Sequence, residues 1–145
     1  MPGFQRLSSQ NMFTFGREHE RNCAVRNLRK PDDILLITNV VDGVHDVLEG
    51  KVSPDAIRSV IILAFSLGGS GVWEQAGSWL RKLAAKYPEL ESVWTELSTN
   101  SDGKVRFRVA CFINELPKTL ALEIGSRLKE DRHKRTREMV QGRLS

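Results

Sequence analysis

The chain has 145 residues, of which 40% are hydrophobic and 28% are charged, a composition typical of an ordinary soluble globular domain. Its longest apolar run, VIILAFSL at residues 60–67, is far shorter than the roughly 20 residues that a membrane-spanning helix needs. Residues 1–19 lack a cationic start followed by an apolar stretch, so we expect no signal peptide, a cytoplasmic protein and no membrane partner. Cys23 and Cys111 lie far apart, which is typical of reduced thiols without excluding a disulfide.

The pattern becomes helical only after the first thirteen residues. Residues 1–13 show no periodicity and contain Pro, Gly, Ser and Asn, so they predict a mobile N-terminal arm. Residues 14–145 predict a single all-helical domain. Its first helix is expected to be capped by Thr14 and to end near Arg29, because Pro31 suits the first turn of the next helix.

The next two predicted helices cover residues 32–49 and 54–67. The first of them has the clearest amphipathic face of the chain, formed by Ile34, Ile37, Val41, Val44 and Leu48. The second is apolar on almost all sides, which predicts a position in the middle of a bundle or stack. The sequence GGSG at residues 68–71 predicts a turn after it.

Five more helices are predicted in the second half of the chain, and no segment shows the period-2 alternation of a strand. They are expected at 72–87, at 88–99, within 101–116, after Pro117, and from Asp131 onward. The fold class is therefore all-α, with about eight helices joined by short connectors.

An internal repeat lies in the last third of the chain. DGKVRFRVA begins at Asp102 and DRHKRTREM begins 29 residues later at Asp131, so that two arginines follow each acid at matching positions: Arg106 and Arg108, then Arg135 and Arg137. This arrangement, over residues 101–144, resembles the HEAT and armadillo-like α-solenoid family. In that family each unit is a pair of antiparallel helices, and a recurrent Asp and Arg link successive units. The resemblance implies that the helices stack as antiparallel pairs in an α-α superhelix.

The acids and arginines of the repeat predict two different roles. Asp102 and Asp131 suit helix N-caps, where a carboxylate accepts hydrogen bonds from free backbone N–H groups. Arg106 and Arg135 are expected to bridge to the carboxylate of a neighbouring unit. The other two arginines, Arg108 and Arg137, point away from the apolar side of their helices and are predicted to contact a partner.

Three other features are candidate contact surfaces. Asp42, His45, Asp46 and Glu49 share one face of the second helix. Their spacing suits a metal, but no other segment supplies a further ligand, so we expect a solvated acidic strip and no metal. Trp79 lies off the main apolar stripe and is a candidate interface anchor.

The third surface is the C-terminal part of the chain, which carries the whole net charge of +4. Residues 127–143 contain seven Lys and Arg and three acids, whereas the rest of the chain is neutral. Arg132, Lys134 and Arg137 are therefore predicted to contact a partner.

The sequence contains no set of residues suited to catalysis. GGSG has no following lysine, and neither cysteine has an adjacent His–Asp pair, so we expect no enzyme and no cofactor. Stacked helix pairs present a long surface, which favours a protein-binding module. The resemblance extends to the small immunity proteins with which bacteria neutralise toxin domains, and it implies such a domain as partner. The acidic strip would then bind a basic toxin, or the basic end an acidic one. Nucleic-acid binding by the C-terminal helix and a role as an adaptor subunit are the alternatives.

Overall fold

The computed structural model describes residues 14–144, and within this range the chain forms α-helices and short 3₁₀ turns without any strand. The α-helices are α2 (Arg17–Val25), α3 (Pro31–Leu48), α4 (Arg58–Leu67), α5 (Ser70–Lys86), α6 (Glu91–Ser98), α7 (Gly103–Phe112), α8 (Lys118–Leu128) and α9 (Lys134–Leu144). The 3₁₀ turns are η1 (Pro54–Ile57), η2 (Pro88–Leu90) and η3 (Ile113–Glu115). The prediction of an all-α chain with about eight helices is confirmed. The predicted arm, residues 1–13, lies outside the described residues.

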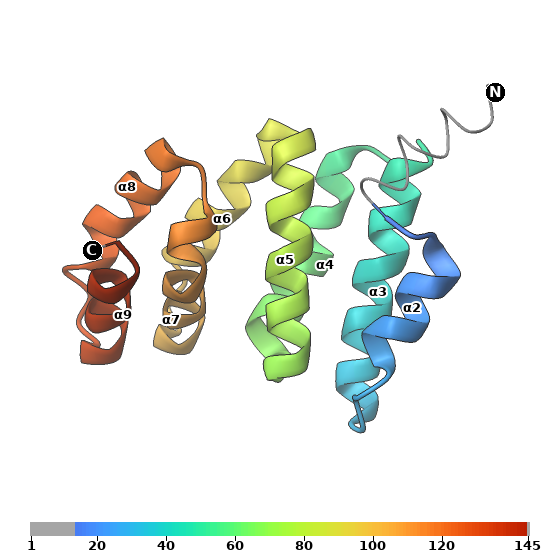
Figure 1. The fold of residues 1–145 in the computed structure, drawn as a ribbon, viewed down its shortest axis with the longest axis horizontal. Helices are drawn as coiled ribbons and strands as arrows, with labels where there is room; N and C mark the ends of the chain where they lie inside the picture. Colours follow the sequence, from blue (N-terminus) through green and yellow to red (C-terminus); the bar gives the residue numbers. More distant parts are fainter. Residues whose placement is uncertain (1–13, 145) are drawn as a thin grey trace.

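The helices are arranged as four antiparallel pairs that follow one another along the longest axis of the molecule (Figure 1). The pairs are α2–α3, α4–α5, α6–α7 and α8–α9. Neighbouring pairs pack through α3 against α5, α4 against α6, α6 against α8, and α7 against α9. None of these helices is both long and apolar enough to cross a membrane, as far as residues 14–144 are concerned.

Prolines and aspartates mark where the helices begin, much as the sequence predicted. Pro31 occupies the first turn of α3, and Pro54 begins the 3₁₀ turn that precedes α4. The Asp102 side chain caps α7 by accepting a hydrogen bond of 2.9 Å from the backbone N–H of Lys104. The first helix differs from the prediction, because it spans only Arg17–Val25.

The centre of the core is a cluster of four aromatic rings at the junction of the second and third pairs. Phe65 of α4, Trp73 of α5, Trp94 of α6 and Phe112 of α7 lie with ring centroids 5.3–6.1 Å apart. Phe65 and Trp94 are almost completely buried. The cluster thus contains one ring from each of the four helices of the second and third pairs. This agrees with the central position predicted for residues 54–67. Two leucines of α4 nevertheless face outward, with Leu63 51% and Leu67 68% exposed.

Gly77 leaves room for the ring of Phe112, at the end of α7, to lie against α5 at this cluster. A Cβ atom placed on Gly77 would collide with the ring of Phe112. That ring is held by its aromatic neighbours and by the backbone of α7, so it has little room to retreat. Glycine is therefore required here for packing and not for backbone conformation.

We expect Gly77→Ala to destabilise the protein by about 1–3 kcal/mol, because overpacking a filled core displaces side chains from their preferred rotamers. Urea denaturation measures the change. The matched control is Gly142→Ala in α9, where an added Cβ meets no atom within 4 Å and replacing a helical glycine is stabilising or neutral. Equal effects of the two substitutions would contradict this account of Gly77.

Candidate functional site

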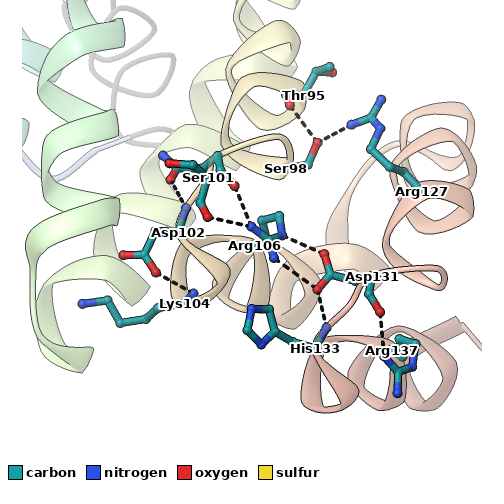
Figure 2. Close-up of polar contacts among 11 residues, drawn as sticks. Thr95, Ser98, Ser101, Asp102, Lys104, Arg106, Arg127, Asp131, His133 and Arg137 are labelled. Atoms are coloured by element: carbon teal, nitrogen blue, oxygen red, sulfur yellow. Dashed lines mark hydrogen bonds and ion pairs between the residues drawn. The ribbon is translucent and has the colours of Figure 1, made fainter.

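Arg106 of α7 links the third pair to the fourth (Figure 2). Its Nε donates to Oδ1 of Asp131 at 2.7 Å and its Nη2 to Oδ2 at 3.4 Å, while Nη1 donates to the carbonyl oxygens of Asn100 at 2.8 Å and Ser101 at 3.1 Å. The two charged side chains are only 9% and 7% exposed. The bridge thus lies where the repeat predicted a link between units, with Asp131 just before α9.

The carboxylate of Asp131 is held in its charged form. Burial by itself raises the pKa of this carboxyl, but the hydrogen bonds from Arg106 and from the backbone N–H of His133 outweigh burial, so the pKa lies below its ordinary value. The link therefore behaves as an ion pair under all but strongly acidic conditions.

The structural repeat has a different register from the one that the sequence predicts. Arg137 Nη1 donates to the carbonyl oxygen of Asp131 at 2.7 Å, six residues back, as Arg106 does to Asn100. The two helices also begin 31 residues apart, α7 at Gly103 and α9 at Lys134. The equivalent residues are therefore 31 apart and not 29.

This register corrects two predicted roles. Arg137 is half-buried and bound to its own turn, so it is a structural residue and not a free contact residue. Arg135 makes no ion pair with a carboxylate among residues 14–144; its guanidinium instead lies 4.3 Å from the ring centroid of Phe107 of α7, on the surface.

Arg108 is also not the exposed binding residue that the sequence predicts. It is 8% exposed, and its Nη1 donates to the carbonyl oxygens of Phe65 at 2.9 Å and Ser66 at 3.1 Å. These carbonyls belong to the last turn of α4, where they lack helical partners and a positive charge is favourable. Burial lowers the pKa of this guanidinium, and the charge of Asp102 partly opposes that effect. Arg108 thus ties the third pair back to the second.

The predicted acidic strip on α3 is occupied by an arginine of the same chain. Arg17 of α2 donates to Asp42 at 3.4 Å, Asp46 at 2.7 Å and Glu49 at 3.1 Å, and Arg21 lies 3.6 Å from Asp42. The strip therefore fastens α2 to α3, while its carboxylates stay partly exposed to solvent. No role for Arg17 was predicted from the sequence, although its position one helix before an acidic strip was a usable signal.

His45, predicted as part of that strip, is buried beneath α2. Its ring is 4% exposed, and its Nε2 lies 3.4 Å from the hydroxyl of Thr14. Burial lowers its pKa below the ordinary value, and the nearby charge of Arg17 lowers it further. Three carboxylates partly oppose this shift: Glu20, Glu49 and Asp42. His45 is therefore a core residue and not a contact residue.

Trp79 is likewise unsuited to be a protruding anchor. Its side chain is 8% exposed, and the ammonium group of Lys82 lies 5.0 Å from its ring centroid. Helix α5 turns this tryptophan toward the groove beside α2, where it packs instead of projecting.

The third predicted surface, here called the basic end, is exposed in the structure. We use this name for Lys129, Arg132 and Lys134, which lie in the α8–α9 turn and the first turn of α9. Lys129 and Arg132 pair with no carboxylate among the described residues, and Lys134 makes a loose, exposed pair with Glu138 at 3.7 Å. Nearby, Arg127 donates to the hydroxyl of Ser98 at 2.6 Å and lines an open depression between the α6–α7 and α8–α9 turns (Figure 2). The chemistry available here is recognition of negative charge.

The part of the chain that the structure describes contains no group of three or more His, Cys, Asp or Glu side chains placed to hold a metal ion. Its strongest electrostatic features are the ion pairs between helices and the unpaired cations of the basic end.

We expect the stability of the protein to fall as the pH decreases from about 7 toward 5. Because the pKa of His45 is lower in the folded state than its ordinary value near 6.5, the unfolded state binds the proton more readily, and acid favours unfolding. Thermal melting at pH 7.5, 6.0 and 5.0 measures this loss. His45→Gln should show a much smaller loss over the same range; an unchanged pH dependence in this variant would show that another group is responsible.

We expect Asp131→Asn to destabilise the protein by roughly 3–5 kcal/mol at pH 7, because it leaves Arg106 buried without its counter-charge. The exposed pair offers a control, and Lys134→Ala should change stability little. Since the Asp131 pKa is depressed in the folded state, the contribution of the carboxylate is fully present above about pH 4 and is lost as the pH falls from there through the lower folded-state pKa, so the difference between the wild type and Asp131→Asn should narrow in acid. Urea denaturation at pH 7 and pH 3 provides the comparison.

Comparisons of this chain with models of known protein families, with curated proteins and with solved structures find no match. The functional conclusions therefore depend on the geometry described above and on the resemblance of residues 101–144 to helical-repeat proteins.

Proposed function

We propose that the protein is a non-catalytic binding module that contacts an acidic protein partner through its basic end. The observation that carries this proposal is that the charges of one surface are paired within the chain and those of the other are not. The acidic strip is already paired with Arg17 and Arg21, whereas Lys129 and Arg132 remain exposed and unpaired within residues 14–144.

The fold supports a role in binding. Four helix pairs in a row present an extended surface, and the polar side chains are engaged mainly in joining one pair to the next. A rigid scaffold of this kind suits a protein that holds charged groups in fixed positions for a partner.

The resemblance to immunity proteins of bacteria narrows the choice of partner to a toxin domain. Because Lys129 and Arg132 of the basic end are exposed and pair with no carboxylate within residues 14–144, the toxin domain would carry a complementary acidic patch around or beside its active site. One copy of the protein would then cover that site, and complementary charges would accelerate the encounter.

A second candidate function, nucleic-acid binding, is favoured by the same exposed cations. A backbone of phosphates would bind to Lys129, Arg132 and Lys134 without regard to sequence.

We expect the double charge reversal Arg132→Glu/Lys134→Glu to weaken binding of the partner at least about tenfold, since like charges then face each other across the interface. The test measures affinity for the protein encoded by the adjacent open reading frame. The matched control is Arg29→Glu/Lys30→Glu, an equally basic and exposed pair in the α2–α3 turn at the opposite end of the stack.

Equal weakening by both double variants would indicate a general charge effect and would contradict docking at the basic end. A mobility shift of duplex DNA by the wild-type protein, with an affinity that falls linearly with log salt and is lost in Arg132→Glu/Lys134→Glu, would place nucleic-acid binding first.

A further inference from the structure

A groove lies between α7 and α9, next to the basic end. These two helices lie side by side in the stack (Figure 1). The groove has a volume of about 570 Å³. It is lined by Phe107, Arg135, Glu138, Met139, Gly142 and Arg143. The sequence analysis assigned no role to most of these residues.

The floor of the groove is apolar and each floor residue is covered by an arginine. Arg135 lies over the ring of Phe107 at 4.3 Å, and Nε of Arg143 lies 3.5 Å from the sulfur of Met139. Both floor side chains are half-buried. An apolar side chain entering between the two arginines would meet a ring and a thioether, both of which adapt well to aliphatic or aromatic groups.

The two guanidinium groups keep donors available for a ligand. A guanidinium has five N–H donors around its edge, so one that rests its face on a ring still directs its edge outward. Neither Arg135 nor Arg143 forms an ion pair with any residue between 14 and 144. The acid in the groove, Glu138, is 3.7 Å from Lys134 and lies beyond ion-pair distance of both arginines.

The positions of the two arginines indicate the shape of a suitable ligand. The backbones of Arg135 and Arg143 are eight residues apart on α9, roughly 12 Å along the helix axis, and their side chains rest on Phe107 and turn back to Met139. Two carboxylates up to eight residues apart on a facing helix can reach both guanidinium groups, and an apolar residue between them would lie over the floor. Gly142, one residue before Arg143, adds no side chain at that end of the groove, and an added Cβ there would meet no atom within 4 Å.

We propose that this groove is the docking site for a helical segment of the protein partner that carries two carboxylates on either side of an apolar side chain. This inference rests on the proposed function and adds the place and chemistry of the contact. A protein segment fits better than a phosphate backbone, because the apolar floor between the two arginines offers nothing to a sugar–phosphate chain.

The test uses a capped 13-residue alanine-based peptide with a central Leu and a Glu four residues to either side of it, together with a twin in which both Glu are Gln. Titration of the ¹⁵N-labelled wild-type protein should shift the amide resonances of Phe107 and of residues 135–143. The Gln twin should bind at least about tenfold more weakly, because it loses both charge-assisted contacts.

Three variants test the groove itself. Arg135→Gln and Arg143→Gln should each weaken the Glu peptide at least about fivefold, and Gly142→Leu should abolish binding by filling the groove. Arg29→Gln is the control and should bind as the wild type does. Thermal melting establishes that each variant is folded, and Gly142→Ala, which adds only a methyl group, should retain binding.

Several outcomes would overturn the proposal: no binding of the Glu peptide at millimolar concentration, equal binding of the Gln twin, resonance shifts away from α7 and α9, or displacement of the peptide by an equal concentration of a duplex DNA oligonucleotide. Failure of the proposed function gives a different result, in which the Glu peptide binds in the groove but the protein encoded by the adjacent open reading frame does not. Conversely, tight binding of that protein to Gly142→Leu would keep the proposed function and reject the groove.

Discussion

Two buried arginines of α7 hold the stack together, and they do so in opposite directions. Arg106 reaches forward to Asp131 before α9, and Arg108 reaches back to the carbonyl oxygens at the end of α4. Each uses its donors on groups that water would otherwise have to satisfy. Helix α7 thereby connects the second, third and fourth pairs, and its position determines how close α5 can approach through Gly77 and Phe112.

This use of charge inside the fold determines which charges remain available outside. Arg106, Arg108 and Arg137 are engaged with the backbone or with Asp131, and Arg17 pairs with the acidic strip of α3. Exposed cations gather at the α8–α9 turn and along α9, and a separate exposed pair, Arg29 and Lys30, lies at the α2–α3 turn. The two proposals on binding concern the region at the α8–α9 turn and the groove beside it.

The helices and their order could be predicted from the sequence because amphipathic periodicity, proline and capping aspartate are local signals. The roles of individual arginines could not. The acceptors of Arg108 are backbone carbonyls more than forty residues earlier. Every residue has a backbone carbonyl, so the sequence does not indicate which of them accept a hydrogen bond. The partners of Arg17 required knowledge of how α2 crosses α3. The repeat was visible, but matching identical letters gave a spacing of 29, whereas the hydrogen bonds follow a spacing of 31.

The first pair is assembled differently from the others. Within α2 only Ala24 is buried, and the helix is fastened to α3 through Arg17, Arg21 and the buried contact between Thr14 and His45. Within each of the other pairs, the two helices pack on each other chiefly through aromatic and aliphatic side chains. Added electrolyte screens partly exposed charges but strengthens the burial of apolar surface when the ions are excluded from it. The packing of α2 on α3 and the packing within the other pairs therefore respond to salt in opposite ways. A kosmotropic salt weakens the ion-paired contact of α2 with α3 and strengthens the apolar contacts of the other pairs.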